Sequence, residues 1–139
     1  MIVFALRHAD RTEGDDLSPD GVTRAKLLAQ LLGGSGVSTA FVSTANRAKK
    51  TLQPLKDALR DRLTIKSATE VQEIVDGVKA LPDDAVAVIV GHSNTVPESI
   101  KALTGKVVKI EDNEFDKLFV LLMSGGASVV SQGRYGKPT

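Results

Sequence analysis

The sequence predicts an α/β fold of three layers, in which helices cover both faces of a mostly parallel central sheet. Short apolar stretches alternate along the chain with longer stretches in which apolar residues recur at helical spacing. This alternation is typical of strand–helix–strand units. Residues 2–6 and 85–90 are apolar throughout, as expected for strands that are buried on both faces of a sheet.

The length and the composition fit one globular domain. The chain has 139 residues, of which 42% are hydrophobic and 25% are charged, and a domain of this length buries a core without covalent staples. The absence of cysteine excludes disulfides, thiol catalysis and cysteine metal sites. We therefore expect a single domain that spans residues 1–139.

The charge balance and the hydropathy argue against two classes of partner. The formal net charge is +1, which predicts neither nucleic-acid nor membrane-surface binding. The basic residues between Lys49 and Arg62 are interspersed with Asp57 and Asp61, which favours a solvated helix face. No stretch approaches the roughly 18 apolar residues of a membrane span. We expect a cytoplasmic protein, and the alternative is a precursor that has lost a signal peptide.

The first half of the chain is predicted to fold as strand, helix, strand and helix. Ser18 is a favourable N-cap, Pro19 suits the first helical position, and Gly33 suits the helix end. The second strand is expected at 39–43 and the second helix within 44–61, where Pro54 predicts an early kink or a late start. The inner faces of the two helices are predicted to consist of Val22, Ala25, Leu28, Ala29 and Leu32 in the first and Ala48, Leu52, Leu55 and Leu59 in the second.

The second half continues this alternation and then departs from it. A short strand is expected at 62–66, a helix within 67–82, a strand at 85–90 and a helix at 94–103. The inner face of the helix within 67–82 is predicted to consist of Val71, Ile74, Val75, Val78 and Leu81. Residues 117–123 and 128–132 then read as two strands with a hairpin-like link, and we expect them to add antiparallel or edge strands.

Polar side chains gather where three of the predicted strands end. Because the carboxyl ends of parallel strands meet at one edge of a sheet, ligands of open α/β sheets bind there. Arginines, both histidines and the starts of two helices predict an anion site, and a phosphate monoester is its natural ligand. The side chains are Arg7 and His8 after the first strand, Ser43 and Arg47 after the second, and His92 and Ser93 after the strand at 85–90.

These residue types support phosphoryl chemistry that uses no metal. A histidine attacks phosphorus when one ring nitrogen is unprotonated and the other is held by a hydrogen bond. Arg7, Arg47 and a protonated His92 are expected to balance the charge of the phosphoryl group. Asp15 and Asp16 are expected to be solvated loop residues. The chain has no dense carboxylate cluster of the kind that a magnesium phosphatase needs.

Four segments carry a family resemblance in the order expected along the chain. They are Arg7-His8-Ala9 followed by Asp10; Leu17, Ser18, Gly21, Arg24 and Ala25 around the start of the first helix; Ser43, Arg47 and Thr51; and Gly91-His-Ser-Asn-Thr-Val-Pro97. Together they resemble the motifs of the histidine phosphatase superfamily, also called the phosphoglycerate mutase-like family, in a compact bacterial branch. Each motif alone is a weak signal, and the four together are a strong one. Residues 116–122 and 134–136 also resemble that branch, so the resemblance covers nearly the whole chain.

The resemblance implies a role for each matching residue. His8 would be the nucleophile and would pass through a phosphohistidine. Arg7, Arg47 and His92 would form the phosphate pocket, which Ser93 is expected to complete. No cofactor and no metal are implied. The substrate would be a phosphorylated small molecule or a phosphoprotein.

The general acid has three candidates, and the absence of a dedicated acid is a fourth possibility. In larger members a glutamate after the third strand protonates the leaving oxygen, which makes Glu70 and Glu73 candidates here. Residues 67–70 match a capping box, which argues for a structural role of Glu70. Glu73 points away from the predicted apolar face. Asp10, two residues after the nucleophile, is the third candidate.

The short chain favours hydrolysis over mutase activity. Its longest non-helical insert, 105–116, is too small for an elaborate lid, so water is expected to reach the phosphohistidine. We therefore expect a histidine phosphatase, and the alternatives are a phosphohistidine protein phosphatase and a non-catalytic domain that binds phosphate. A serine hydrolase at Ser93 is disfavoured because Thr95 stands where the nucleophile elbow needs glycine.

Overall fold

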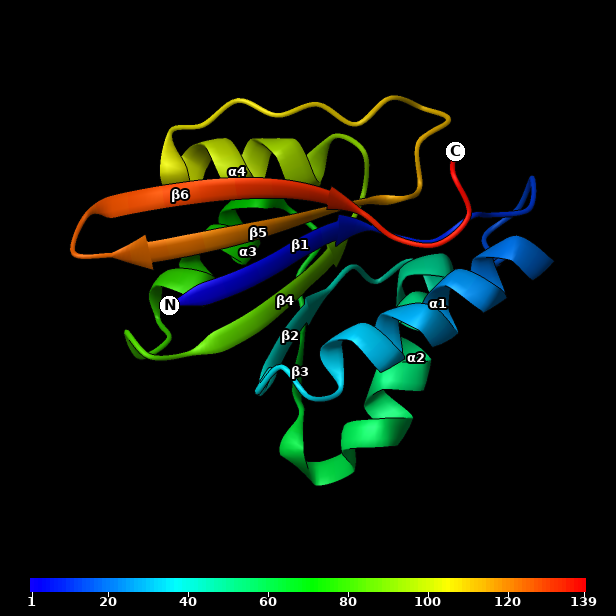
Figure 1. Ribbon diagram of the computed structural model, residues 1–139, viewed down its shortest axis with the longest axis horizontal. Helices are drawn as coiled ribbons and strands as arrows, with labels where there is room; N and C mark the ends of the chain where they lie inside the picture. Colours follow the sequence, from blue (N-terminus) through cyan, green and yellow to red (C-terminus); the bar gives the residue numbers. More distant parts are fainter.

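The computed structural model describes all residues from 1 to 139 and contains one six-stranded sheet with the order β3-β2-β4-β1-β5-β6 (Figure 1). Strands β1 to β4 are parallel, β5 is antiparallel to β1, and β6 is antiparallel to β5. The strands are β1 (Ile2–Arg7), β2 (Thr39–Val42), β3 (Thr64–Ser67), β4 (Val86–Gly91), β5 (Lys117–Ser124) and β6 (Ala127–Arg134). The predicted mostly parallel sheet with an added antiparallel pair is confirmed.

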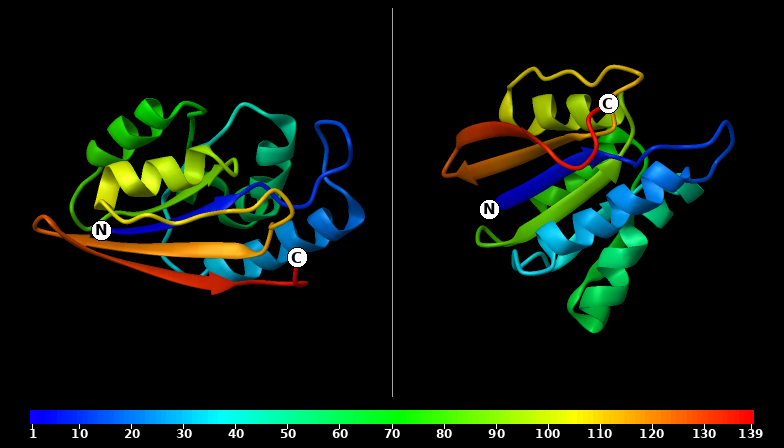
Figure 2. Two further views of the ribbon diagram at one scale, coloured as in Figure 1. Left: turned by 90° about the horizontal axis from the view of Figure 1, so that it is seen from above. Right: turned by 45° about the vertical axis from the view of Figure 1, so that its right-hand side comes forward.

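Helices cover both faces of the sheet, which confirms the predicted three layers. Helices α1 and α2 pack on one face and α3 and α4 on the other (Figure 2). The helices are α1 (Pro19–Leu32), α2 (Asn46–Leu59), the short 3-10 helix η1 (Arg60–Arg62), α3 (Val71–Lys79) and α4 (Thr95–Thr104). None of them has both the length and the apolar character needed to cross a membrane.

Alternation along the central strands supplies both layers of the core. In β1, Val3 and Ala5 pack with α3 and α4, whereas Leu6 packs with α1 and α2. In β4, Val88 and Val90 face α1 and α2. Because successive strand side chains point to opposite faces, a continuous apolar run fills both interiors. The wholly apolar stretches of the sequence are therefore the two strands at the centre of the sheet.

The predicted start and end of α1 are confirmed, but its predicted inner face is partly wrong. The Gly21 N–H donates to Ser18 Oγ at 3.2 Å, as expected of an N-cap. Val22 is 44% exposed, whereas Arg24 is buried at 2% exposure. Arg24 can lie on the buried face of α1 because its guanidinium has hydrogen-bond partners there. The spacing of apolar residues in the sequence does not reveal these partners.

Arg24 ties α1 to two distant segments. Its Nε–H donates to Asp10 Oδ1 at 2.6 Å, and its Nη2 donates to the Lys137 carbonyl at 2.7 Å and its Nη1 to the Tyr135 carbonyl at 2.5 Å. The guanidinium thus joins the loop after β1, the first turns of α1 and the chain after β6. A buried charge with all of these partners is well satisfied.

The start of α2 differs from the prediction, whereas the turn between β5 and β6 agrees with it. Helix α2 begins at Asn46 and runs through Pro54 to Leu59, so the late start predicted from Pro54 is wrong. The predicted hairpin link is confirmed, because Ser124 pairs with Ala127 across Gly125 and Gly126, which have φ values of 57° and 84°. Positive φ at both central positions is the requirement of a type I′ two-residue hairpin turn.

Gly21→Ala is expected to destabilise the fold by about 1–3 kcal/mol, because overpacking forces the backbone to shift. A Cβ atom at this position would lie 2.0 Å from the Asp10 carbonyl oxygen, where α1 crosses the loop that follows His8. Urea denaturation measures the free energy of unfolding. The control is Gly34→Ala, where a Cβ meets nothing within 4 Å. Equal stability of the two variants would contradict this account of the helix crossing.

Candidate active site

A polar cleft lies where β1, β2 and β4 end. Its volume is about 420 Å³, and no apolar residue lines it. The lining residues are Arg7, His8, Arg11, Arg47, Thr69, Glu70, His92, Ser93, Asn94 and Thr95. The cleft thus brings together the predicted site residues Arg7, His8, Arg47, His92 and Ser93. Arg11 and Thr69 were not predicted to belong to it, because neither of them directly follows an apolar run that marks a strand.

The register of the central strands places the two histidines next to each other. Arg7 pairs with Gly91 in the parallel ladder of β1 and β4. The His8 N–H continues this ladder and donates to the Gly91 carbonyl at 2.9 Å. The ring centroids of His8 and His92 are consequently 5.4 Å apart in an edge-on arrangement.

His8 is held as a neutral imidazole with a defined tautomer. Its Nδ1–H donates to the Ala9 carbonyl at 2.8 Å, which leaves Nε2 unprotonated. The Arg47 Nε–H donates to this Nε2 at 3.2 Å. Burial lowers the pKa of His8 to about 4, and the charges of Arg7 and Arg47 contribute to this lowering. At neutral pH, His8 therefore has an unprotonated Nε2, whose lone pair accepts the Arg47 N–H when the cleft holds no ligand.

Arg47 contacts both histidines from the first turn of α2. Besides its bond to His8, its Nη2 donates to His92 Nδ1 at 3.4 Å. Thr51, one turn later in the helix, accepts the Ala9 N–H at 2.8 Å and donates to the Arg47 carbonyl at 2.8 Å. This hydroxyl fastens the residue after His8 to the turn that carries Arg47. These two hydrogen bonds explain why the third sequence motif has a threonine at position 51.

Asp15 is an exposed loop residue, as predicted, but it also holds Arg47 and caps α2, which was not predicted. Its carboxylate accepts the backbone N–H groups of Asn46 at 2.9 Å and Arg47 at 3.0 Å, and the Arg47 Nη1 at 3.0 Å. These hydrogen bonds lower the pKa of Asp15 to about 2. Asp16, likewise expected in solvent, forms an ion pair with Lys50 at 2.7 Å.

This capping changes the anion site that was expected from two helix starts. The first backbone N–H groups of α2 donate to Asp15, so they are not available to bind an anionic ligand. The start of α4 is different, because His92, Ser93, Asn94 and Thr95 all line the cleft. One helix N-terminus, that of α4, therefore faces the place where an anion would bind.

Arg7 is supported by the segment between α4 and β5. Its Nη1 donates to the carbonyls of Asp112 at 2.8 Å and Glu114 at 3.0 Å, and its guanidinium lies over the Phe115 ring at 4.0 Å. Its Nε is buried and has no hydrogen-bond partner. Residues 105–116 thus fix the arginine and leave one donor unused, which is a typical preparation for an anionic ligand.

His92 differs from the protonated form that was expected. Burial is the largest cause that lowers its pKa, followed by the charges of Arg47 and Arg7. Because Arg47 donates to Nδ1, the proton of the neutral ring is on Nε2, which lies 2.7 Å from Ser43 Oγ. The free cleft therefore favours a neutral His92, and a dianionic ligand would favour its protonation.

The three acid candidates occupy different environments. Glu70 lines the cleft. Helix α3 begins at Val71 with Glu70 as its N-cap residue, and Glu73 Oε1 accepts the Glu70 N–H at 3.2 Å, so the capping box predicted at 67–70 is displaced to 70–73. Asp10 does not line the cleft, because its carboxylate binds Arg24. Of the three, only Glu70 is positioned at the cleft.

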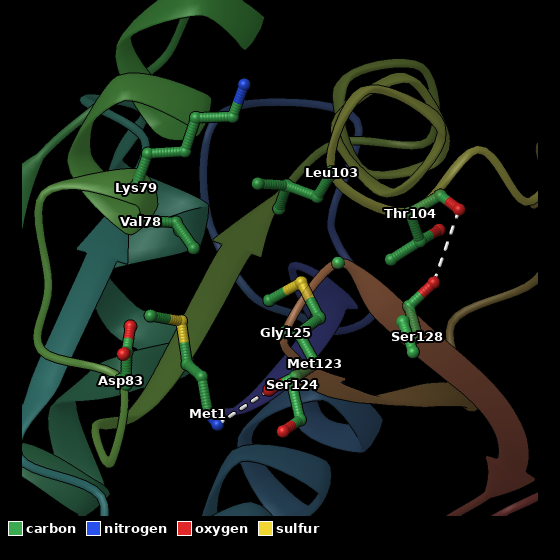
Figure 3. A pocket seen from close by; sticks show the side chains of 12 residues that line it. Met1, Val78, Lys79, Asp83, Leu103, Thr104, Met123, Ser124, Gly125 and Ser128 are labelled. Carbon is green, nitrogen blue, oxygen red and sulfur yellow. Dashed lines mark hydrogen bonds between the residues drawn. The ribbon is translucent and has the colours of Figure 1, made fainter.

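A second cavity of about 330 Å³ lies at the opposite end of the sheet (Figure 3). It is bounded by Met1, by the end of α3 and by the turn between β5 and β6. Lys79 and Asp83 are its charged residues, and its walls include the side chains of Val78 and Leu103. Neither histidine and no arginine lines this cavity, and the residues predicted to bind phosphate line the first cleft.

Comparison with known proteins agrees with this site. Residues 6–78 match the family model described as histidine phosphatase superfamily (branch 1). The chain belongs to the histidine phosphatase superfamily. The expectation of an enzyme of the histidine phosphatase class is thereby confirmed. No curated protein sequence matches the chain.

Several solved structures share the fold at low sequence identity. The protein histidine phosphatase SixA, solved with tungstate, is 20% identical with a TM-score of 0.78, over 96% of this chain and 97% of that chain. A phosphoglycerate mutase from Plasmodium falciparum is 15% identical with a TM-score of 0.63, over 97% and 89%. A mycobacterial glucosyl-3-phosphoglycerate phosphatase is 13% identical with a TM-score of 0.70, over 99% of both chains. These structures confirm the phosphoglycerate mutase-like fold.

The His8 imidazole is expected to titrate with a midpoint of about pH 4. Its pKa lies below the ordinary value of 6.5, so the ring stays neutral as the pH falls through 6 and gains its proton only near pH 4. The chain has two histidines, and an NMR titration resolves both. The signal that is missing in His8→Ala identifies His8. A midpoint near 6.5 for that signal would contradict the neutral, buried nucleophile.

Proposed function

We propose that this protein is a metal-independent phosphatase that hydrolyses phosphate monoesters or phosphoramidates through a phosphohistidine at His8. The observation that carries this proposal is the neutral His8 Nε2, which is unprotonated and lies beside the Arg47 guanidinium in a cleft without apolar residues. Fixed cations that surround an uncharged nucleophile suit attack on a dianionic phosphoryl group.

In the first step, the lone pair of His8 Nε2 attacks phosphorus, and the bond from phosphorus to the leaving oxygen breaks. Arg7, Arg47 and Ser93 bind the phosphoryl oxygens, and His92 joins them as the bound dianion favours its protonation. The unused Nε–H of Arg7 gains a partner in this way. Glu70 gives its proton to the leaving oxygen and becomes a carboxylate.

In the second step, water attacks the phosphohistidine. Glu70 takes a proton from this water as the new phosphorus–oxygen bond forms and the phosphorus–nitrogen bond breaks, which restores neutral His8 and releases phosphate. No residue of 105–116 lines the cleft, and carbonyls of this segment accept from Arg7. Access of water to the intermediate supports hydrolysis over transfer of the phosphoryl group back to a second hydroxyl.

A phosphohistidine protein phosphatase is the second candidate. The similarity to the protein histidine phosphatase SixA over 96% of this chain supports it. A phosphoramidate leaves more readily than an alkoxide, so a phosphohistidine substrate would depend less on Glu70. In both cases the substrate is phosphorylated, and residues 1–139 act as a single domain without a cofactor.

His8→Ala is expected to reduce hydrolysis of p-nitrophenyl phosphate to the rate without enzyme, while the wild type retains its activity in EDTA between pH 5 and 8. The variant lacks the nucleophile, and the chelator tests the proposed independence from metal ions. Circular dichroism checks that the variant is folded. Full activity of His8→Ala, or loss of wild-type activity in EDTA, would refute the mechanism. Inactivity of the wild type on both this ester and a phosphohistidine protein would favour a binding-only domain.

Glu70→Gln is expected to lower kcat for an alkyl phosphate by about 10²-fold, and far less for p-nitrophenyl phosphate, because a good leaving group needs little protonation. Steady-state kinetics on both substrates measure the difference. Glu73→Gln is the matched control, since Glu73 caps α3 and does not line the cleft. An equal decrease on both substrates, or a larger decrease in Glu73→Gln, would argue against Glu70 as the acid.

A further inference from the structure

The side chain of Phe115 contacts two residues of the proposed mechanism, and the mechanism gives it no role. The guanidinium carbon of Arg7 lies 4.0 Å from the centroid of the Phe115 ring. The centroids of the His8 and Phe115 rings are 6.0 Å apart, and the ring planes are tilted by 49°, which is within the range of aromatic contacts. Phe115 does not line the cleft, so any effect on the reaction passes through Arg7 and His8.

The alternation of side chains along β1 explains why Arg7 reaches this ring. Val3 and Ala5 pack with α3 and α4, and Arg7, two residues further along the strand, points to the same side of the sheet. The segment 105–116, which joins α4 to β5, contributes Ile110 to the core on that side. Arg7 therefore meets the segment that carries Phe115.

The chain on both sides of the Phe115 ring is fixed by hydrogen bonds of its own. The Phe115 N–H donates to Thr139 Oγ1 at 2.8 Å. The carboxylate of the next residue, Asp116, accepts Arg134 Nη1 at 2.8 Å and the Thr139 hydroxyl at 3.0 Å. The Asp116 carbonyl accepts the Tyr135 N–H at 2.9 Å. The ring is thus held by the start of the β5–β6 ladder, which gives it a defined position beside Arg7.

This ring supports Arg7 without neutralising its charge. Arg47 is paired with the Asp15 carboxylate at 3.0 Å, whereas no carboxylate forms an ion pair with Arg7. The polar partners of Arg7 are carbonyl oxygens, and the face of Phe115 attracts its guanidinium through the ring quadrupole. A carboxylate in this place would compete with phosphate for Arg7. The aromatic face leaves the charge and the unpartnered Nε–H of Arg7 to the ligand.

The same ring shields His8 from water on one side. His8 is 2% exposed, and burial is the largest cause that lowers its pKa to about 4. The titratable groups that act on this imidazole are Arg7 on β1, Arg47 on α2 and His92 after β4, and all three lower its pKa. A smaller side chain at position 115 would admit water and would therefore raise the pKa of His8.

We propose that Phe115 is a positioning residue of the cleft, whose ring holds the Arg7 guanidinium and the His8 imidazole in the arrangement that receives the phosphoryl group. This inference rests on the proposed phosphatase function. It gives the segment 105–116 a part in phosphate binding although none of its residues lines the cleft. The required feature is the aromatic face and not apolar bulk, because the main contact is with a cation.

The test compares Phe115→Leu, which removes the ring and keeps an apolar side chain, with Phe115→Tyr, which keeps the ring. Calorimetry measures the affinity for inorganic phosphate, and steady-state kinetics on p-nitrophenyl phosphate measure kcat and KM. Phe4→Leu is the matched control, because Phe4 is a partly buried phenylalanine of β1 that packs on the core beneath α1 and α2. Circular dichroism checks that each variant is folded.

Phe115→Leu is expected to weaken phosphate binding by about fivefold and to lower kcat/KM by about tenfold, because the cation and the nucleophile both lose their support. Phe115→Tyr and Phe4→Leu are expected to stay within about twofold of the wild type, because both keep an aromatic face at position 115. In Phe115→Leu, the NMR midpoint of His8 rises from about pH 4 towards 6.5. A loss of stability alone would not move this midpoint.

An unchanged phosphate affinity or an unchanged His8 midpoint in Phe115→Leu would overturn the proposal. An equal loss of affinity in Phe115→Tyr or in Phe4→Leu would overturn it as well, because the aromatic face at position 115 would then not be the cause. The binding and NMR measurements need no turnover. If the wild type binds phosphate without hydrolysing any ester, and Phe115→Leu alone binds it weakly, the catalytic function fails and the positioning role of Phe115 stands.

Discussion

The parallel pairing of β1, β2 and β4 is the constraint on which the cleft depends. Arg7 is paired with Gly91, and Val42 is paired with Val90, so the three strands end almost level with one another. The residues that follow them are consequently forced together although they are far apart in the sequence. A shift of one residue in this register would turn each side chain to the other face of the sheet. The site is thus a consequence of the same hydrogen-bond ladder that forms the core.

Two carboxylates hold the arginines beside the cleft and attach the loop that follows β1 to the helices. Asp10 is bound by Arg24, and Asp15 is bound by Arg47 and by the first turn of α2. Both belong to the loop that begins directly after His8. The loop is therefore attached to α1 at one point and to α2 at another. Its acidic residues orient Arg24 and Arg47, and Arg47 lines the cleft and contacts both histidines.

The strand ends and the site residues beside them could be predicted from the sequence because they depend on short-range patterns. Apolar runs marked β1 and β4, and the polar residues directly after them were found at the cleft. Asp15 is the exposed loop residue that was expected, but its contacts with Asn46 and Arg47 were missed, because these partners are more than 30 positions away and no local pattern encodes such a contact. Arg24 was missed on the inner face of α1 for the same reason: its burial is made favourable by Asp10 and by the chain after β6. The capping role predicted for Glu70 is confirmed in a different form, because α3 begins three residues later than expected and Glu70 is its N-cap residue.

The contact of Arg24 with the carbonyls of Tyr135 and Lys137 has a consequence for the order in which the protein matures. Synthesis proceeds from the N-terminus, so this segment emerges after every other element of the fold. The strands and helices that carry both histidines are complete by then, but the loop beside His8 still lacks the last partner of the arginine that anchors it. The loop beside His8 therefore acquires its final surroundings only after the segment that follows β6 has been made.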